Sequence, residues 1–503
     1  MFMKKLIPAI IIIIIISFPY IYAAIAPGGS MIFGGFLMNP LDGNSYLAKM
    51  EEGARGEWLF TLPFTAEKWV GVPLFTFYIF LGNLAGWLHI PLIWIFHLAR
   101  IGAAVFLLWS LKRFSGHLFP DSAKQADQFF LLVSLGSGLG WLFYAIGGLT
   151  ADFWVAEAYP FLSMYTNPHF PLGLGLMLLI LSIENRGQWK LFLLNCGLSI
   201  LLSIILPFGV VLVGLILGIQ WLWDCISNAK WRVPWEVAVV LPGVFWVGGQ
   251  YLFTIHNPLM ADWNQQNVTA APNIWDWIVS FSPALILMFF ALNKNKIEEI
   301  PVTWKRMLIW VAVATILQVI PFSLQRRFLL GFYIPLAAFS IQAIHLFGTK
   351  VRKWLWPITL LLSVPTNLVL IATGLFAAQT LPRTLYLTPA ESSVYTWISQ
   401  NTQPDSIILC GPRSGNRIPA YTGRRVIYGH PFETADASKN EKAVQDYFAD
   451  PTSVQSSELL DSNHVDYIFV GDEEREMNQS MSSFPGSVAF QDGEYQVLKL
   501  DNP

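Results

Sequence analysis

Residues 7–26 read IPAIIIIIIISFPYIYAAIA, an almost unbroken apolar run just after the basic pair Lys4 and Lys5. About 20 apolar residues are enough for a helix to cross the hydrocarbon core of a bilayer. The AAIA stretch imitates a signal-peptidase site, but the apolar run is longer than that of a typical signal peptide. We therefore expect a retained first transmembrane helix. Either interpretation places the residues after Ala26 outside the cytoplasm.

The composition of the whole chain agrees with this start. Of 503 residues, 54% are hydrophobic and only 13% are charged, which excludes an ordinary soluble protein. Residues 380–503 differ from the rest, because they carry 9 Lys and Arg against 17 Asp and Glu. We predict two domains, a membrane domain at 1–379 and a soluble extracytoplasmic α/β domain at 380–503. The three cysteines suggest neither a disulfide framework nor a paired metal-ligand spacing.

Hydropathy predicts ten more spans after the first, which makes about eleven transmembrane helices in a mostly α protein. The predicted spans lie at 91–112, 126–148, 169–185, 190–206, 208–224, 233–255, 273–293, 305–324, 328–348 and 354–378. With the N-terminus in the cytoplasm, most basic residues before the tail fall inside, as the positive-inside rule requires. Residues 69–90 are also apolar, but counting them as a span would place the basic loops outside. We therefore expect an outer interfacial helix there, within a first outer loop at 27–90.

That first outer loop holds a polar segment, residues 41–52, which reads LDGNSYLAKMEE. A carboxylate at a lipid–water boundary can be held ionised by a nearby cation and can then act as a base toward a hydroxyl group. This makes Asp42 the first candidate for catalysis. The alternative is a solvated turn, because Asp, Gly, Asn and Ser are common turn formers.

The second outer loop offers a candidate metal site. It contains Asp152 and Glu157, and Asn167 and His169 follow at the start of the next span. Carboxylates with an imidazole and an amide suit a divalent cation such as Mg²⁺ or Mn²⁺ beside a phosphate. The alternative is a structural interfacial histidine with a helix-capping asparagine.

Three arginines lie against the charge bias of the loops. Arg326 and Arg327 occupy a short outer loop, and Arg100 lies deeper in a span. Guanidinium groups grip phosphate in a bidentate manner, so a lipid-linked phosphate is a natural partner. Snorkelling of the pair to lipid headgroups, and pairing of Arg100 with a carboxylate, are the structural alternatives.

The acidic tail has the pattern of a small α/β domain. A helix begins after Thr388 with Pro389 at its first position, and short β-rich runs alternate with a helical segment at 440–449. Between these runs, residues 411–425 and 428–434 are rich in Gly, Arg, His and Tyr and include Arg424 and His430. Such residues suit contact with polyols or phosphate, whereas a turn-rich loop without binding function is the alternative.

This arrangement resembles the GT-C superfamily of membrane glycosyltransferases that use polyprenyl-phosphate sugars, such as protein mannosyltransferases and aminoarabinose transferases. The motifs that carry the resemblance are residues 42–52, Asn167-Pro168-His169-Phe170, Arg326-Arg327-Phe328, and Gly423-Arg424-Arg425-Val426 with Gly429-His430. The family often has two adjacent acidic residues in the first loop, whereas Gly43 follows Asp42 here.

The resemblance implies that Asp42 acts on the acceptor and that the second-loop carboxylate corresponds to Asp152 or Glu157. It implies substrate-binding roles for the other candidate residues, namely Asn44, Tyr46, Lys49, Arg100, Glu157, Asn167, His169, Arg326, Arg327, Arg424 and His430. Asp152, Glu157 and His169 are the candidate ligands of a divalent cation.

The implied reaction moves a hexose or pentose from a polyprenyl phosphate to an acceptor hydroxyl at the outer face of a bacterial inner or plasma membrane, with inversion. The partners are then membrane lipids, the lipid-linked donor and an acceptor glycan, lipid or protein, and no nucleic acid is expected. A transporter or flippase of a lipid-linked saccharide is the alternative, since it would also carry outer carboxylates and arginine pairs.

Overall fold

The computed structural model describes residues 2–68, 70–182, 188–231, 233–294, 301–478 and 483–500. The chain forms two compact units, each assembled from distant segments. We call residues 1–19, 97–249 and 268–375 the helical unit, and residues 20–96, 250–267 and 376–503 the mixed unit. The first loop therefore folds with the tail. The predicted domain boundary after residue 379 stays a prediction.

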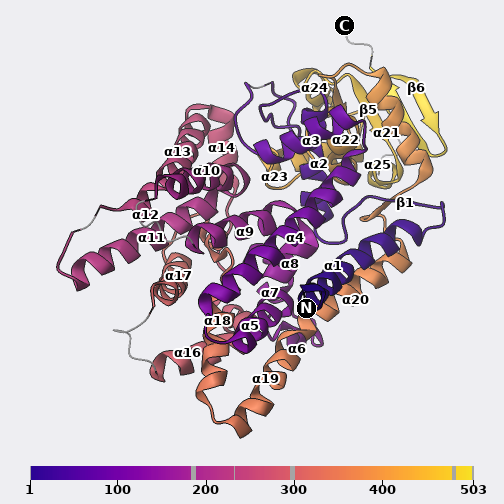
Figure 1. The fold of residues 1–503 in the computed structure, drawn as a ribbon. Helices are drawn as coiled ribbons and strands as arrows, with labels where there is room; N and C mark the ends of the chain where they lie inside the picture. Colours follow the sequence, from indigo (N-terminus) through magenta and orange to yellow (C-terminus); the bar gives the residue numbers. More distant parts are fainter. Residues whose placement is uncertain are drawn as a thin grey trace. The chain divides into compact units, whose positions relative to one another are not determined.

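The helical unit consists mainly of helices (Figure 1), and many of them are apolar. Its elements, some of which continue into the mixed unit, are α1 (Phe2–Ile25), α4 (Leu92–Leu118), α5 (Ala123–Leu135), α6 (Gly140–Tyr144), α7 (Ala151–Trp154), η1 (Ala156–Ala158), α8 (Pro160–Thr166), α9 (His169–Ser182), α10 (Trp189–Ile205), α11 (Pro207–Ser227), α12 (Trp235–Ala238), α13 (Leu241–His256), α15 (Ile274–Phe281), α16 (Ala284–Lys294), α17 (Val302–Val319), η3 (Gln325–Leu329), α18 (Tyr333–Leu346), α19 (Thr349–Ser363) and α20 (Pro365–Thr380).

The polytopic helical fold is confirmed, but the predicted number of about eleven spans is not. Among the described residues, seven helices are long and apolar enough to cross a membrane, or up to eight if a bent pair counts as one span. That pair is α15 with α16, which meet at an angle of 83° within the predicted span 273–293. Helix α9 has only 14 residues, about 21 Å, and the end of its predicted span at 183–185 lies outside the described residues.

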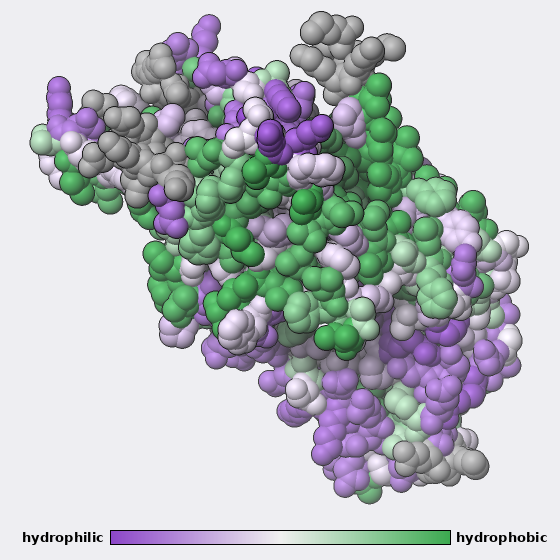
Figure 2. Space-filling model, turned by 90° about the horizontal axis from the view of Figure 1, so that it is seen from below, coloured by the Kyte–Doolittle hydropathy of each residue, from purple (hydrophilic) through white to green (hydrophobic). Residues whose placement is uncertain are grey.

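Large apolar side chains are exposed along these helices, as a lipid-facing surface requires. Examples are Ile14 on α1, Trp94 and Trp109 on α4, and Phe245 on α13. Figure 2 shows hydrophobic side chains gathered over a broad area of the face in view. Exposed apolar surface of this extent is costly in water and is satisfied in a bilayer.

The mixed unit contains the predicted α/β fold. Its five-stranded sheet has the order β4-β3-β5-β7-β6, in which β4, β3 and β5 are parallel and β7 is antiparallel to both of its neighbours, β5 and β6. The strands are β3 (Ile407–Leu409), β4 (Arg425–Val426), β5 (Tyr467–Val470), β6 (Ser487–Asp492) and β7 (Tyr495–Lys499). Helices that accompany the sheet are α21 (Pro389–Asn401), α22 (Pro412–Thr422), α23 (Ala437–Ala449), α24 (Val454–Ser462) and α25 (Asp472–Met477).

The first loop joins this unit through a small sheet and two helices. Strand β1 (Ile32–Phe33) pairs with β2 (Tyr386–Leu387), so the loop and the start of the tail are hydrogen-bonded. Helix α2 (Pro40–Ala54) packs against α3 (Thr76–Leu88) and α22 (Figure 1), and α14 (Pro258–Gln266) completes the unit. The backbones of α2 and α3 approach so closely that a Cβ added to Gly82 would lie 1.9 Å from the carbonyl oxygen of Met50.

Helix α3 corresponds to the predicted interfacial helix at 69–90, of which Trp69 lies outside the described residues. It has 13 residues, which at about 1.5 Å per residue gives a length of about 20 Å. This is shorter than the hydrocarbon core of about 30 Å. Its position at the interface stays a prediction.

Candidate functional site

Asp42 lies in the first turn of α2, so the alternative of a solvated turn at 42–45 is wrong. Asn39 caps this helix, and its Nδ2 donates to Asp42 Oδ2 at 2.5 Å. His430 Nε2 lies 3.2 Å from Asp42 Oδ1. The Asp42 side chain is 40% exposed, whereas that of His430 is only 2% exposed. The structure thus brings together two residues that the sequence suggested separately, a carboxylate open to solvent and a buried imidazole.

Lys49 lies two turns further along the same helix, and it is fully buried. Its Nζ contacts both carboxylate oxygens of Glu433 at 2.8 Å, and Ser45 Oγ donates to Glu433 Oε1 at 2.6 Å. Burial alone would raise the pKa of Glu433, but the Lys49 ammonium group holds that pKa below its usual value. The prediction that Lys49 binds substrate is corrected here, because its ammonium group is committed to an internal ion pair.

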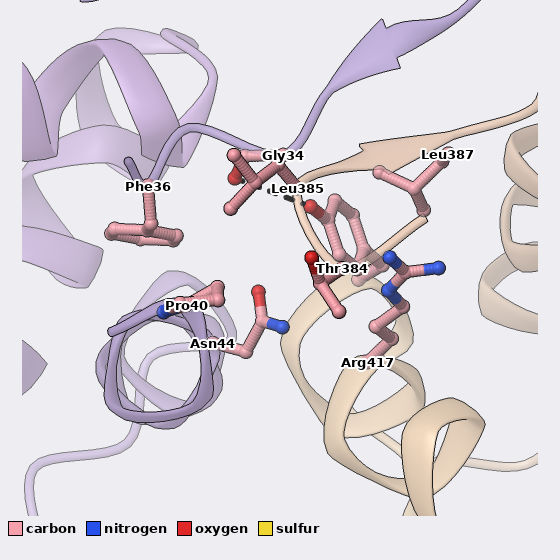
Figure 3. A pocket seen from close by; sticks show the side chains of 9 residues that line it. Gly34, Phe36, Pro40, Asn44, Thr384, Leu385, Leu387 and Arg417 are labelled. Atoms are coloured by element: carbon pink, nitrogen blue, oxygen red, sulfur yellow. Dashed lines mark hydrogen bonds between the residues drawn. The ribbon is translucent and has the colours of Figure 1, made fainter. Parts of the chain in front are cut away.

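Asn44 and Tyr46 have partners within the mixed unit. Asn44 Nδ2 donates to Asn416 Oδ1 at 2.8 Å, and Asn44 lies beside Thr384 at a cavity of about 10 Å³ (Figure 3). That volume is about one water-sized sphere, too small for a sugar ring. The Tyr46 ring stacks on Tyr78 with ring centroids 4.4 Å apart. Asn44 therefore joins α2 to the tail, and Tyr46 belongs to an aromatic pair beside Asp42.

The helical unit contains a separate charged centre. Glu157, in η1, has a side chain only 4% exposed, and its Oε1 lies 3.4 Å from Arg326 Nε and 3.7 Å from Arg327 Nη1. The Arg326 guanidinium also lies over the Trp154 ring at 5.0 Å. Among the described residues, Glu157 Oε1 and Arg326 Nε have no hydrogen-bond partner. Two guanidinium groups against one carboxylate leave a positive charge, so this centre suits an anion.

The predicted metal site is not formed. Asp152 Oδ1 accepts from Thr150 Oγ1 at 2.6 Å, and its Oδ2 accepts from Thr366 Oγ1 at 2.9 Å. These internal contacts hold Asp152 in place, while Glu157 faces the arginine pair. No group of three or more His, Cys, Asp or Glu residues in the described part of the chain has the arrangement of a metal site. Asp152, Glu157 and His169 therefore do not fit a divalent cation as a set of ligands.

Two predicted phosphate-binding arginines have structural partners instead. Arg100 is 1% exposed, and its Nη1 donates to the carbonyl oxygens of Ile16, Met164 and Tyr165. The guanidinium of Arg424 donates to Thr402 and to carbonyl oxygens nearby in the tail. Main-chain carbonyl oxygens are therefore partners of Arg100, and oxygen atoms of the tail are partners of Arg424.

The Gly-rich stretch 411–425 is mostly helix α22, so the alternative of a turn-rich loop is wrong for this stretch. The Glu473 carboxylate accepts from the main-chain N–H groups of Arg413 and Ser414 at the start of α22, at 3.0 and 3.2 Å. The N-terminus of a helix is a common place for a phosphate to bind, and a carboxylate occupies it here.

The two other residues predicted to bind substrate, Asn167 and His169, lie between two helices. Asn167 follows α8 as its C-cap, and His169 begins α9, where its ring contacts that of Phe170.

The residues that sequence reasoning missed are Asn39, Tyr78 and Glu433. Glu433 stands three residues after His430, but nothing in the sequence indicates that it pairs with a lysine 384 residues earlier. Tyr78 lies within the apolar segment 69–90, where nothing in the sequence marks it as a site residue. Only Asn39 gave a local signal, since an asparagine before a proline is a common start of a helix.

Similarity to solved structures adds to this geometry. No known family and no curated protein matches the chain in sequence. The oligosaccharyltransferase of Archaeoglobus fulgidus in its apo form is 11% identical, with a TM-score of 0.57 over 92% of this chain and 69% of that one. ArnT from Cupriavidus metallidurans bound to undecaprenyl phosphate is 11% identical, with a TM-score of 0.53 over 96% of this chain and 97% of that one.

The chain has the GT-C fold. Within this GT-C fold, the mixed unit holds Asp42 with His430, and the helical unit holds Glu157 with Arg326 and Arg327. The first pair offers a carboxylate for proton transfer, and the second group offers positive charge for an anion.

Proposed function

We propose that this protein is a membrane glycosyltransferase that moves a hexose or pentose from a polyprenyl-phosphate donor to an acceptor hydroxyl, with inversion, at the outer face of a bacterial membrane. The observation that carries the proposal is the exposed carboxylate of Asp42 held by the buried imidazole of His430. The GT-C fold supports it, and the similar ArnT binds undecaprenyl phosphate.

In the proposed reaction, the acceptor oxygen attacks the anomeric carbon from the face opposite the phosphate. The bond from the acceptor oxygen to carbon forms as the bond from carbon to phosphate oxygen breaks. The hydroxyl proton passes to the carboxylate of Asp42, which is the general base. The first turn of α2 places this carboxylate near the positive end of the helix dipole.

The leaving polyprenyl phosphate carries the negative charge that develops in this reaction. Arg326 and Arg327 are the proposed partners of that phosphate, because both lie beside a single buried carboxylate, that of Glu157. A guanidinium binds phosphate through parallel charged hydrogen bonds, which stabilise the departing group. The donor lipid and the surrounding membrane lipids are the proposed partners, and dependence on a divalent cation stays a prediction without assigned ligands.

The proposal is tested with purified full-length protein and a panel of radiolabelled polyprenyl-phosphate sugars. Asp42→Asn removes the base but keeps the shape of the side chain, and we expect a loss of about 10²- to 10⁴-fold in turnover. Asp405→Asn is the matched control, because Asp405 lies in the same unit and pairs with exposed Lys68. Full turnover by Asp42→Asn would exclude Asp42 as the base.

The same experiment separates transfer from transport. A flippase of lipid-linked saccharides would move the labelled donor across a vesicle membrane and leave the sugar on its lipid. Release of free polyprenyl phosphate together with a labelled acceptor is expected for the transferase. Intact donor on the opposite leaflet would contradict it.

A further inference from the structure

The contact between Asp42 and His430 can serve catalysis in two opposite ways. In one, the carboxylate orients the imidazole, and His430 is the base, as in hydrolase triads. In the other, the imidazole orients the carboxylate, and Asp42 is the base. The two are distinguished by which ring nitrogen of His430 carries the hydrogen, and the hydrogen bonds of the ring decide this.

The main-chain N–H of Phe432 donates to His430 Nδ1 at 3.1 Å. A nitrogen that accepts a hydrogen bond carries no hydrogen, so the hydrogen of the ring lies on Nε2. That Nε2–H points to Asp42 Oδ1 at 3.2 Å. Both ring nitrogens are therefore engaged, and neither is available to take a proton from a substrate.

The burial of the two groups leads to the same result. The His430 side chain is 2% exposed, whereas that of Asp42 is 40% exposed, so the carboxylate is the member of the pair that an acceptor can reach. Together with Asn39, which donates to Oδ2, His430 fixes both oxygens of Asp42. A carboxylate held by two donors has a defined direction for its remaining lone pairs.

The turn that carries His430 is itself rigidly held. Thr434 Oγ1 accepts from the N–H groups of Gly429 and His430, and the Thr434 N–H donates to the His430 carbonyl at 3.0 Å. Glu433 in the same turn binds Lys49 and Ser45 of α2. Gly429 packs so closely on α22 that an added Cβ would lie 2.3 Å from the Gly415 carbonyl oxygen.

From these contacts we infer that the tail turn 429–434 completes the catalytic centre, with His430 as the positioning residue of Asp42 and Glu433 as the anchor of the turn on α2. This inference rests on the proposed function. It assigns the turn to catalysis itself rather than to recognition of the acceptor.

The test compares His430→Gln with His430→Leu. Both variants lose the contact with the Phe432 N–H, but only Gln keeps an N–H group that reaches the Nε2 position. If His430 positions Asp42, His430→Leu lowers kcat by about 10- to 100-fold, the effect of losing one hydrogen bond to a charged group, with little change in KM. His430→Gln then retains most of the activity. In the Asp42→Asn background, His430→Leu causes no further loss.

Three results would overturn the inference: equal losses in the Gln and Leu variants, full activity of the Leu variant, or a His430→Leu loss that persists in the Asp42→Asn background. Arg413→Gln is the control, because it breaks the Arg413–Asp472 pair elsewhere in the mixed unit and should leave kcat unchanged.

A readout without turnover separates this inference from the proposed function. If wild-type protein transfers no sugar from any donor, the proposed function fails. The shifts in Tm for Asp42→Ala, which removes the acceptor oxygens, for His430→Leu and for the double variant still report the contact between the two residues. A double variant less destabilised than the sum of the single variants supports the pairing, and strictly additive shifts would contradict it.

Discussion

Replacing Glu433 by Gln should destabilise the protein strongly, because it leaves the Lys49 ammonium group buried without its counter-charge. Lys49 Nζ and Glu433 Oε2 are 2.8 Å apart, and their side chains are 0% and 12% exposed. At that distance, with an effective dielectric constant of about 20, the attraction between the two charges is about 6 kcal/mol. Desolvation offsets part of it, so we expect Glu433→Gln to lower the free energy of unfolding by about 3–5 kcal/mol.

The second half of this prediction concerns the double variant Lys49→Met with Glu433→Gln. It has no unpaired buried charge, so it should be more stable than Glu433→Gln alone, although it lacks the ion pair. The assay is denaturant or thermal unfolding of the full chain in detergent, followed by tryptophan fluorescence. Arg413→Gln is the matched control, since its pair with Asp472 is more exposed and should contribute about 0–1 kcal/mol.

Two results would refute the reasoning. A loss of less than about 1 kcal/mol in Glu433→Gln would mean that the pair is hydrated as if it lay on a surface. If the double variant loses as much free energy of unfolding as the two single variants together, then Lys49 and Glu433 contribute to stability independently rather than through their ion pair.

Three further predictions concern other carboxylates and the arginine pair. Burial raises the pKa of Glu52 to about 7, so the folded state binds more protons than the unfolded state between about pH 4.5 and 7, and stability falls as pH rises through that window. Glu52→Gln should therefore gain stability relative to wild type at pH 8, on the order of 3 kcal/mol, but not at pH 4, and a gain independent of pH in unfolding experiments would contradict this. On the proposed function, Arg326→Gln should weaken binding of added undecaprenyl phosphate about 10- to 100-fold in a thermal-shift titration, whereas unchanged binding would exclude Arg326 from the phosphate site. Glu473→Gln should lower the free energy of unfolding by about 1–2 kcal/mol, because it weakens the cap of α22. Glu476 is exposed on α25, the helix that also carries Glu473, and Glu476→Gln should change stability very little. Equal unfolding midpoints of the two variants would count against the cap.

The helical fold could be predicted because long apolar runs such as 7–26 report membrane burial directly. The span count could not, because hydropathy detects neither the bend between α15 and α16 nor the short length of α9, α10 and α13. Helix α22 was missed because Gly411, Pro412 and Pro419 suggest a loop. Pro412 stands at the first helical position, where its missing N–H costs nothing, and Pro419 lies inside the helix.

The candidate site was predicted only where chemistry is local. Asp42 stood out as an acid next to an apolar run, and Arg326 with Arg327 stood out as charges in a short loop. The partners could not be found in this way, because Glu433 meets Lys49 through the tertiary fold and Arg100 meets main-chain carbonyls. Sequence patterns report which residues are costly to bury but not which group will satisfy them.

The pairing of β1 with β2, and of Lys49 with Glu433, has a consequence for biosynthesis. The ribosome must add 384 residues after Lys49 before Glu433 exists. At about 5–20 residues per second this takes roughly 20–80 s. Until then Lys49 on α2 has no counter-charge, and the face of α2 that packs against α22 is exposed. We therefore expect nascent chains to be susceptible to proteolysis or to need chaperones. A chain truncated before residue 430 should never mature, even with its membrane helices intact.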